Sequence, residues 1–414
     1  SIFGLQLNTQ ASNVFQEPFQ GIQTINEFKG HVFDSSSKDP LAYVDINISG
    51  TNISTITNKE GAFLLKVPSE YLNKTIKISL LGYAKGEIEI SSLKKDENKI
   101  YLDVSITQLS NVNIYGIKNA EALVRATLNR KSEFYDNDRT KMTAFYRETI
   151  KKRRKNASLS EAVVKIHKQP YNNKRRDHIE LIKARKSTDY SKLDTLALKL
   201  QGGPFSNLYT DIIKYPEYIF NNEDLPKYKF SYGNSTSINN RQIYVINFKQ
   251  KEGLSMPLYY GKLYIDAETL ALTNAVYSLN VSNRELASRM YVRKKPRKVD
   301  VYPTEATYRV NYRTTNDQWH YAYSNISLTF KVNWKGKLFN NTYTLNSEMA
   351  ITDLEIQDTN LAKIRGKLIR PTTILSEKAS GFSDPRFWGA YNIIEPEKSI
   401  ESAIKKIQKQ LKRT

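Results

Sequence analysis

Cysteine is absent from this sequence of 414 residues. Without a thiol there can be no disulfide bond, thiolate metal site or cysteine nucleophile within it. Long apolar stretches are missing as well, since no run of about 18 apolar residues occurs. The sequence therefore predicts no membrane-spanning helix.

Histidine is scarce, and the four present are His31, His167, His178 and His320. No two of them have the i,i+4 spacing of a zinc-binding helix. The sequence also lacks the Gly-x-Ser-x-Gly motif of hydrolases, a Walker phosphate loop and a dinucleotide-binding fingerprint. We therefore expect each histidine to be a surface or strand histidine and not a metal ligand.

Acidic residues are outnumbered, with 42 Asp and Glu against 63 Lys and Arg, which gives a net charge of +21. Such a charge suits either a nucleic acid or an anionic lipid or protein surface. No helix-turn-helix, zinc finger or RNA-recognition motif supports the first possibility. We predict no nucleic-acid partner, and an acidic partner or anionic lipid surface in its place.

Composition indicates a folded protein of two or three domains that is rich in strands. Hydrophobic residues make up 39% and charged residues 25% of the chain, which is the range of globular proteins. Tyrosine is abundant, with 27 residues against 16 phenylalanines. Its ring can be buried while its hydroxyl stays hydrated, which suits strands with one wet face.

Residues 28–115 show the pattern of a complete small β-sandwich. Val44, Ile46 and Ile48 alternate with polar residues, and 54–57 and 63–67 continue with short strands. The turn between these strands ends in Gly61, a residue free to adopt positive φ. Further strands are predicted over the following ranges: 75–81, 87–90, 99–104 and 109–115.

This stretch resembles the carboxypeptidase regulatory-like domain, a transthyretin-type sandwich. The matching positions are Gly30-x-Val32-x-Asp34, Pro40-Leu41, Val44-x-Ile46, Gly50-Thr51, Thr55-x-Thr57, Gly61-x-Phe63 and Gly82-Tyr83. The resemblance implies no peptidase activity. It implies a Bacteroidota envelope protein, because this domain commonly precedes TonB-dependent transporters there.

The N-terminal residues 1–27 are predicted to be an arm or the remnant of a signal peptide. Residues 1–5 are apolar, and Thr9-Gln10-Ala11 has the small-x-small pattern of a cleavage site. We expect residues 1–11 to be the remnant of an export signal, and an ordinary N-terminal arm is the alternative.

Residues 116–395 are predicted to form a large antiparallel β-rich domain with one or two covering helices. A helix is predicted at 120–129, and strands at 143–151 and 158–167 flank a basic hairpin tip at 152–156. The segment 205–220 has apolar residues at near-helical spacing and is predicted to cover one sheet face, with a lid as the alternative. The remaining predicted strands lie in the hairpin 258–280 and at 179–183, 305–314, 320–333 and 342–352.

Two further resemblances concern this domain. The strand from Gly261 to Asp266 is weakly similar to those of periplasmic lipoprotein-carrier half-barrels, and it transfers no ligand site. The chain as a whole resembles uncharacterised carboxypeptidase-like regulatory domain proteins. The supporting motifs are 144–149 (AFYRET), 202–204 (GGP), 332–335 (VNWK) and 387–396 (FWGAYNIIEP).

Residues 396–414 are predicted to form a short basic amphipathic helix. Ser399 is a suitable N-cap, and Ile400, Ile404, Ile407 and Leu411 form one apolar stripe. The helix either docks on its own domain or binds a partner or membrane surface.

Carboxylates offer the remaining candidates for chemistry. Glu148 and Glu161 could face each other across the 143–167 hairpin, as glycoside hydrolysis would require, or pair with neighbouring Arg147 and Lys165. Four oxygen-bearing residues near turns could hold Ca²⁺, but turn chemistry explains them adequately: Asp34, Asp45, Asn58 and Glu60. We therefore assign no catalytic, cofactor-binding or metal-binding residue.

The sequence favours a non-enzymatic periplasmic protein that docks on an outer-membrane protein complex as an accessory or scaffold subunit. The complex would be an outer-membrane protein assembly machine or a TonB-dependent transporter. One alternative is a carrier that holds a lipid or lipoprotein acyl chain in an apolar half-barrel. A carboxylate-dependent hydrolase is the other, and it lacks a motif.

Overall fold

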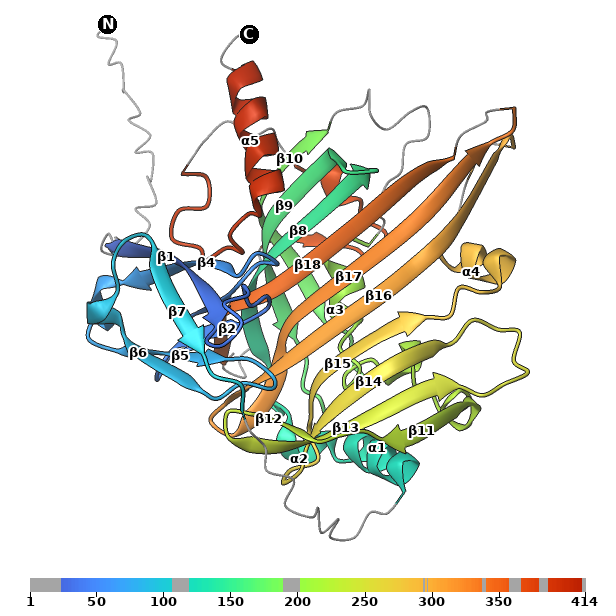
Figure 1. Ribbon diagram of the computed structural model, residues 1–414, viewed down its shortest axis with the longest axis horizontal. Helices are drawn as coiled ribbons and strands as arrows, with labels where there is room; N and C mark the ends of the chain where they lie inside the picture. Colours follow the sequence, from blue (N-terminus) through green and yellow to red (C-terminus); the bar gives the residue numbers. More distant parts are fainter. Residues whose placement is uncertain are drawn as a thin grey trace, which may run out of the picture.

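The computed structural model describes residues 24–105, 119–188, 202–292, 295, 297–336, 340–356, 366–379 and 386–411. The predicted signal remnant at 1–11 and the predicted strand at 109–115 lie outside these residues. Within them the protein is mainly β, as predicted, with a small two-sheet sandwich beside a large antiparallel sheet (Figure 1).

The N-terminal sandwich has its own apolar core, built from alternating residues such as Val44, Ile46 and Phe63. Gly61 adopts φ +73° in the predicted turn, and an added Cβ would lie 2.8 Å from the carbonyl oxygen of Val32. One sheet has the strand order β4 (Ala62–Pro68), β1 (Ile25–Asp34), β7 (Asn98–Leu102), and the other has the order β3 (Ser54–Ile56), β2 (Asp45–Ile48), β5 (Thr75–Ser79), β6 (Gly86–Glu89).

Among the residues that the structure describes, the large sheet has 12 strands, and its strands pair antiparallel. Its main path follows the order β11 (Tyr228–Tyr232), β13 (Arg241–Gln250), β14 (Tyr259–Asp266), β15 (Leu272–Leu279), β16 (Val299–Thr315), β17 (Gln318–Trp334), β18 (Asn341–Ile356), β8 (Thr140–Lys152), β9 (Lys155–Lys168), β10 (His178–Thr188), β19 (Lys367–Ile369), and β12 (Thr236–Ile238) pairs with β13. All predicted strands of this region are present, and several are longer than the alternation indicated.

Within the described ranges, five helices and several short 3-10 turns accompany the strands. They are α1 (Ala120–Asn129), α2 (Lys131–Phe134), α3 (Pro204–Leu208), α4 (Arg284–Tyr291), α5 (Lys398–Leu411), η1 (Ser69–Tyr71), η2 (Ile90–Ser92), η4 (Pro216–Tyr218), η5 (Leu225–Lys227) and η6 (Leu375–Glu377). The helix predicted at 120–129 has the expected bounds, and its side chains Leu123 and Val124 are buried. Asn119 caps it, because the Asn119 side chain accepts a hydrogen bond from the Glu121 amide.

The two faces of the large sheet are covered by different parts of the chain. Tyr146 and Met349 point to the face that packs against α1, α3 and the segment that follows α3, and we call it the helix face. Phe145 and Ala350, their neighbours in the strands, point to the opposite face, where they meet Ile56 of the sandwich. We call this second face the sandwich face.

The covering segment predicted at 205–220 lies on the helix face but is not one continuous helix. Only α3 is helical at its start, and a 3-10 turn follows at η4. Helix α3 already ends at Leu208, and Pro216 takes the first position of η4, where its missing amide hydrogen is tolerated. The apolar side chains Phe205, Ile213 and Phe220 are nevertheless buried in the main core, as covering requires.

Candidate functional site

A row of mainly polar residues crosses the sandwich face from strand to strand. Each residue is the direct register partner of the next, so their side chains lie on one face. The row consists of Asn247, Lys262, Val276, Arg309, Asn325, Glu348, Arg147, Glu161 and Arg185. Polar groups gathered in this way make the sandwich face the candidate functional surface.

Half of this row is a buried ion cluster centred on Arg147. The Arg147 Nε atom lies 2.7 Å from Glu161 Oε1, and its Nη1 atom lies 3.2 Å from Glu348 Oε1. Arg185 Nη2 approaches the other oxygen of Glu161 at 2.7 Å. Burial by itself would raise the pKa of Glu161, but the two guanidinium groups hold it below its usual value.

The sandwich covers the middle of the row. The ring of Tyr43 packs on Tyr323 at 5.5 Å, and the guanidinium of Arg309 lies 4.8 Å from the centre of the Tyr43 ring. Arg313 forms an ion pair with Asp45 at the same boundary. The sandwich is thus fixed to the sheet by polar as well as aromatic contacts.

The segment 386–397 covers the ion cluster and also contacts the sandwich. Trp388 packs edge-on against Phe145, and its ring lies 4.8 Å from the Arg185 guanidinium. Arg147 Nη2 donates to the Ile394 carbonyl at 2.8 Å. The Asn392 side chain accepts from the amide and donates to the carbonyl of Lys66 in β4. The 387–396 motif therefore joins the two domains.

Glu148 and Glu161 do not face each other, so this part of the carboxylate hypothesis is wrong. In the β8–β9 register Arg147 lies opposite Glu161, and Glu148 lies opposite Ser160. Neighbouring residues of a strand point to opposite faces. The two carboxylates are consequently separated by the sheet, and Glu161 pairs with Arg147, as the alternative interpretation stated.

Glu148 is buried on the helix face, where its Oε2 atom accepts a hydrogen bond of 2.8 Å from the Tyr146 hydroxyl. Burial raises the pKa of Glu148 from 4.5 to about 7. A carboxyl with a raised folded-state pKa binds its proton more tightly in the folded protein. Its contribution to stability is therefore complete below about pH 4.5 and is lost as the pH rises to about 7.

We expect Glu148→Gln, which stays neutral, to flatten this dependence. Relative to the unmodified protein, its free energy of unfolding should rise by about 2–3 kcal/mol between pH 5 and pH 8. Urea denaturation at both pH values measures this change. Glu89→Gln, at an exposed position of β6, is the control. An unchanged difference between the two pH values would contradict the buried, protonated carboxyl.

All four histidines lie in strands, as predicted, and the structure brings two of them together. His167 and His178 are register partners, and His167 Nε2 lies 3.0 Å from Glu180 Oε2. His31 is half-buried and stacks on Phe33. His320 is buried, and burial lowers its pKa to about 3, so it is neutral at physiological pH.

The four oxygen-bearing residues considered for Ca²⁺ have other partners. Asp34 accepts from the amides of Ser36 and Ser37, and Asp45 pairs with Arg313. Asn58 and Glu60 have the following roles: the Asn58 side chain accepts from two turn amides, and Glu60 accepts from the Lys398 amide at the start of α5. Turn and cap chemistry therefore accounts for Asp34, Asn58 and Glu60, and an ion pair between the two domains accounts for Asp45.

A second buried ion cluster, which the sequence did not indicate, lies on the helix face. Lys168 Nζ is 2.8 Å from Asp177 Oδ2 and 2.7 Å from Asp211 Oδ2. Tyr171 and Tyr312 donate their hydroxyl hydrogens to Asp211 at 2.8 and 2.9 Å. The cluster joins β9 to the covering segment after α3, and every charged group in it is paired.

The basic tip and the C-terminal helix have structural positions. Arg153 and Arg154 form the turn between β8 and β9, with φ +55° at Arg153. Helix α5 begins at Lys398, so Ser399 lies inside it and is not its N-cap. Ile400 and Ile404 pack on Leu159, which docks this half of the helix on its own domain, whereas the side chains of 406–414 lie outside the described residues.

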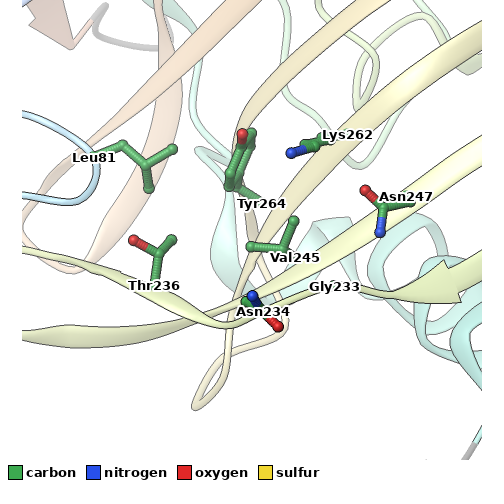
Figure 2. A pocket seen from close by; sticks show the side chains of 8 residues that line it. All are labelled: Leu81, Gly233, Asn234, Thr236, Val245, Asn247, Lys262 and Tyr264. Atoms are coloured by element: carbon green, nitrogen blue, oxygen red, sulfur yellow. The ribbon is translucent and has the colours of Figure 1, made fainter. Parts of the chain in front are cut away.

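One end of the polar row is open, in a cleft of about 530 Å³ between the sandwich and the sheet (Figure 2). Leu81 lines it from the sandwich side. The large β-rich domain contributes Gly233, Asn234, Thr236, Val245, Asn247, Lys262 and Tyr264. Asn247 and Lys262 are register partners, as are Val245 and Tyr264, so these four side chains form the floor.

Comparison with known proteins concerns mainly the N-terminal domain. Residues 28–114 match the family model of the CarboxypepD_reg-like domain, and no curated protein sequence matches the chain. Among the described residues no helix is long and apolar enough to cross a membrane.

Two solved structures are distantly similar to parts of the chain. A DUF1329 family protein from Desulfovibrio piger is 10% identical, with a TM-score of 0.21 over 59% of this chain and 93% of that one. Lipovitellin is 8% identical, with a TM-score of 0.27 over 56% of this chain and 27% of that one. Scores this low carry no argument about function. What the comparisons do show is that the N-terminal sandwich of this protein is a CarboxypepD_reg-like domain.

Proposed function

We propose that this protein is a non-enzymatic periplasmic subunit that docks on an outer-membrane protein complex, either an assembly machine or a TonB-dependent transporter. The observation that carries the proposal is which edge strands of the sandwich contact the large β-rich domain. The edge strands β3 and β4 contact that domain: Ser54 Oγ donates to the Ile351 carbonyl, and the Asn392 side chain pairs with the Lys66 backbone. The other two edge strands, β6 and β7, each end a sheet within the described chain.

An edge strand with unpaired backbone groups is a common place for a partner strand to add. The exposed surface of β7 also carries an aromatic side chain. Tyr101 is 49% exposed and stacks on Phe33 at 5.7 Å, and Val104 is 52% exposed. Lys38 lies 4.7 Å from the centre of the Tyr101 ring. Exposed aromatic rings beside cations are typical anchors of protein interfaces.

The net charge of +21 supports the same proposal, because a basic protein is steered toward acidic proteins and anionic lipid surfaces. The segment 386–397 adds a link between the sandwich and the sheet, because its Ile394 carbonyl accepts from Arg147 and its Asn392 side chain pairs with the backbone of Lys66. A docking subunit that presents two fixed domains to its partner loses little conformational entropy on binding.

The test is affinity purification of the native protein from membranes in mild detergent. We expect one outer-membrane protein complex to copurify in a fixed ratio. Tyr101→Asp should reduce its recovery at least about fivefold, since a hot-spot side chain contributes 2 kcal/mol or more. Tyr218→Asp, at a position 44% exposed, is the matched control and should not reduce it. Recovery without a partner, or equal losses in both variants, would contradict the proposal.

The carrier alternative has less support. A carrier needs a large apolar cavity, whereas the helix face is filled by side chains of the covering segment and α1, among them Leu123, Phe205, Leu208 and Ile213. The cleft on the sandwich face is lined mostly by polar residues. A stoichiometric lipid in native mass spectrometry, with no protein partner, would make the carrier the better proposal.

A further inference from the structure

The open cleft lies where β12 meets the sandwich, and hydrogen bonds fix both of its walls. The Gly82 amide donates to the Ser237 carbonyl at 2.7 Å. The Ser79 hydroxyl donates to Asn239 Oδ1 at 2.6 Å, and the hydroxyls of Ser237 and Ser105 are joined at 2.6 Å. The cleft is therefore formed before any ligand binds, which reduces the entropy cost of binding.

The lining of the cleft is rich in groups that donate hydrogen bonds, and it holds one charge. Lys262 is the only charged residue among those that line it, and it is a cation. Within the described chain, the side chains of Asn234, Asn247, Lys262 and Tyr264 have no hydrogen-bond or ion-pair partner. An ammonium group beside amide and hydroxyl donors is complementary to a carboxylate.

The nearby charges leave no unpaired anion beside Lys262 on its own strand. The next cation along the polar row is Arg309, beyond Val276, and its guanidinium packs on Tyr43. Asp266, two residues after Tyr264 in β14, is already held by Arg241 at 2.6 Å. An acidic ligand at Lys262 would thus meet no unpaired carboxylate from this strand.

The other half of the polar row shows how a peptide fits between the two domains. There the segment 386–397 lies between the sheet and β4, and three cations donate to its main-chain carbonyls. Arg147 donates to Ile394, Lys183 to Phe387 at 3.0 Å, and Lys66 to Gly389. The cleft lies at the other end of the row, between the sandwich and the sheet, and has no occupant from the described chain.

We propose that this cleft binds an extended peptide segment of the partner protein, with an acidic side chain of that segment on Lys262. The inference rests on the proposed docking function and specifies the chemistry that the partner brings. The volume of about 530 Å³ suits a few residues of a peptide. The amides of Asn234 and Asn247 are placed to meet peptide carbonyl and amide groups next to the acidic residue.

The test uses the full-length protein and two labelled probes, the capped pentapeptide Tyr-Thr-Glu-Thr-Tyr and its analogue with a central Gln. Fluorescence anisotropy should show that the Glu peptide binds about two- to fivefold more tightly at low salt, because an ion pair to the exposed Lys262 contributes about 0.5–1 kcal/mol. Lys262→Gln should abolish this preference. Lys249→Gln, at an exposed position of β13 outside the cleft, should retain it.

Equal affinities for the two peptides, or a preference that survives Lys262→Gln, would overturn the inference. Inorganic phosphate that displaces the peptide at equal concentration would also overturn it, since the cleft would then be a site for a free anion. Copurification distinguishes the two proposals. If a partner copurifies and its recovery depends on Tyr101, but the preference for the Glu peptide is absent, only the proposal for the cleft is wrong. If the preference is present but no partner copurifies, only the proposed docking function is wrong.

Discussion

Replacing Arg147 with methionine is expected to lower the free energy of unfolding by about 3–5 kcal/mol, because the change leaves a buried carboxylate without its partner. The guanidinium of Arg147 is 1% exposed and contacts Glu161, Glu348 and the Ile394 carbonyl. Glu161 keeps Arg185, so Glu348 is the group left uncompensated. Equilibrium denaturation in urea at pH 7 measures the loss.

Two further variants test whether the loss of stability comes from the unpaired buried charge. Arg289→Met removes an ion pair to Glu285 whose side chains are 69% and 75% exposed, and it should cost less than about 0.5 kcal/mol. Adding Glu348→Gln to Arg147→Met should restore more than about 1 kcal/mol, because the unpaired charge disappears. A loss below about 1 kcal/mol in Arg147→Met would show that the cluster is hydrated and not buried.

The Arg147 change has a second expected effect, on the segment 386–397. This segment loses the hydrogen bond to the Ile394 carbonyl, while Trp388 keeps its contacts with Phe145 and Arg185. Limited proteolysis should therefore cut the segment faster in Arg147→Met than in Arg289→Met.

Lys168→Met is expected to be comparably destabilising, with a loss of about 3–5 kcal/mol, since it leaves Asp177 and Asp211 buried without the ammonium group that bridges them. The methionine side chain fills a similar volume, so the loss reports the charge and not a cavity. Lys165→Met, on the same strand but half-exposed, is the matched control. The loss should be measured by urea denaturation at pH 7.

The double variant Lys168→Met with Asp211→Asn tests the origin of that loss. Tyr171 and Tyr312 donate to different oxygens of Asp211, so in the variant one hydroxyl still donates to the amide oxygen while the other accepts from the amide NH2 group, and only one buried charge remains. The double variant should therefore be more stable than Lys168→Met by more than about 1 kcal/mol. Strict additivity of two destabilising changes would contradict the role of charge.

Local patterns in the sequence determined the strands and the first helix. Alternation at Val44, Ile46 and Ile48 identified β2, because a strand with one buried face has a period of two. Apolar spacing and the capping residue Asn119 determined α1. The sandwich was recognisable for the same reason, since its turns and alternation are complete within residues 28–114.

Tertiary structure alone decided which charged residues meet. Arg147 and Glu161 are 14 positions apart, and pairing them correctly depends on the hairpin register, which one residue of slip would reverse. Arg147 and Glu348 are separated by 201 positions and meet because β18 inserts beside β8. The cleft likewise needs the sandwich to lie against β12–β14. Strand order depends on the packing of the whole core, and no periodicity within one strand encodes it.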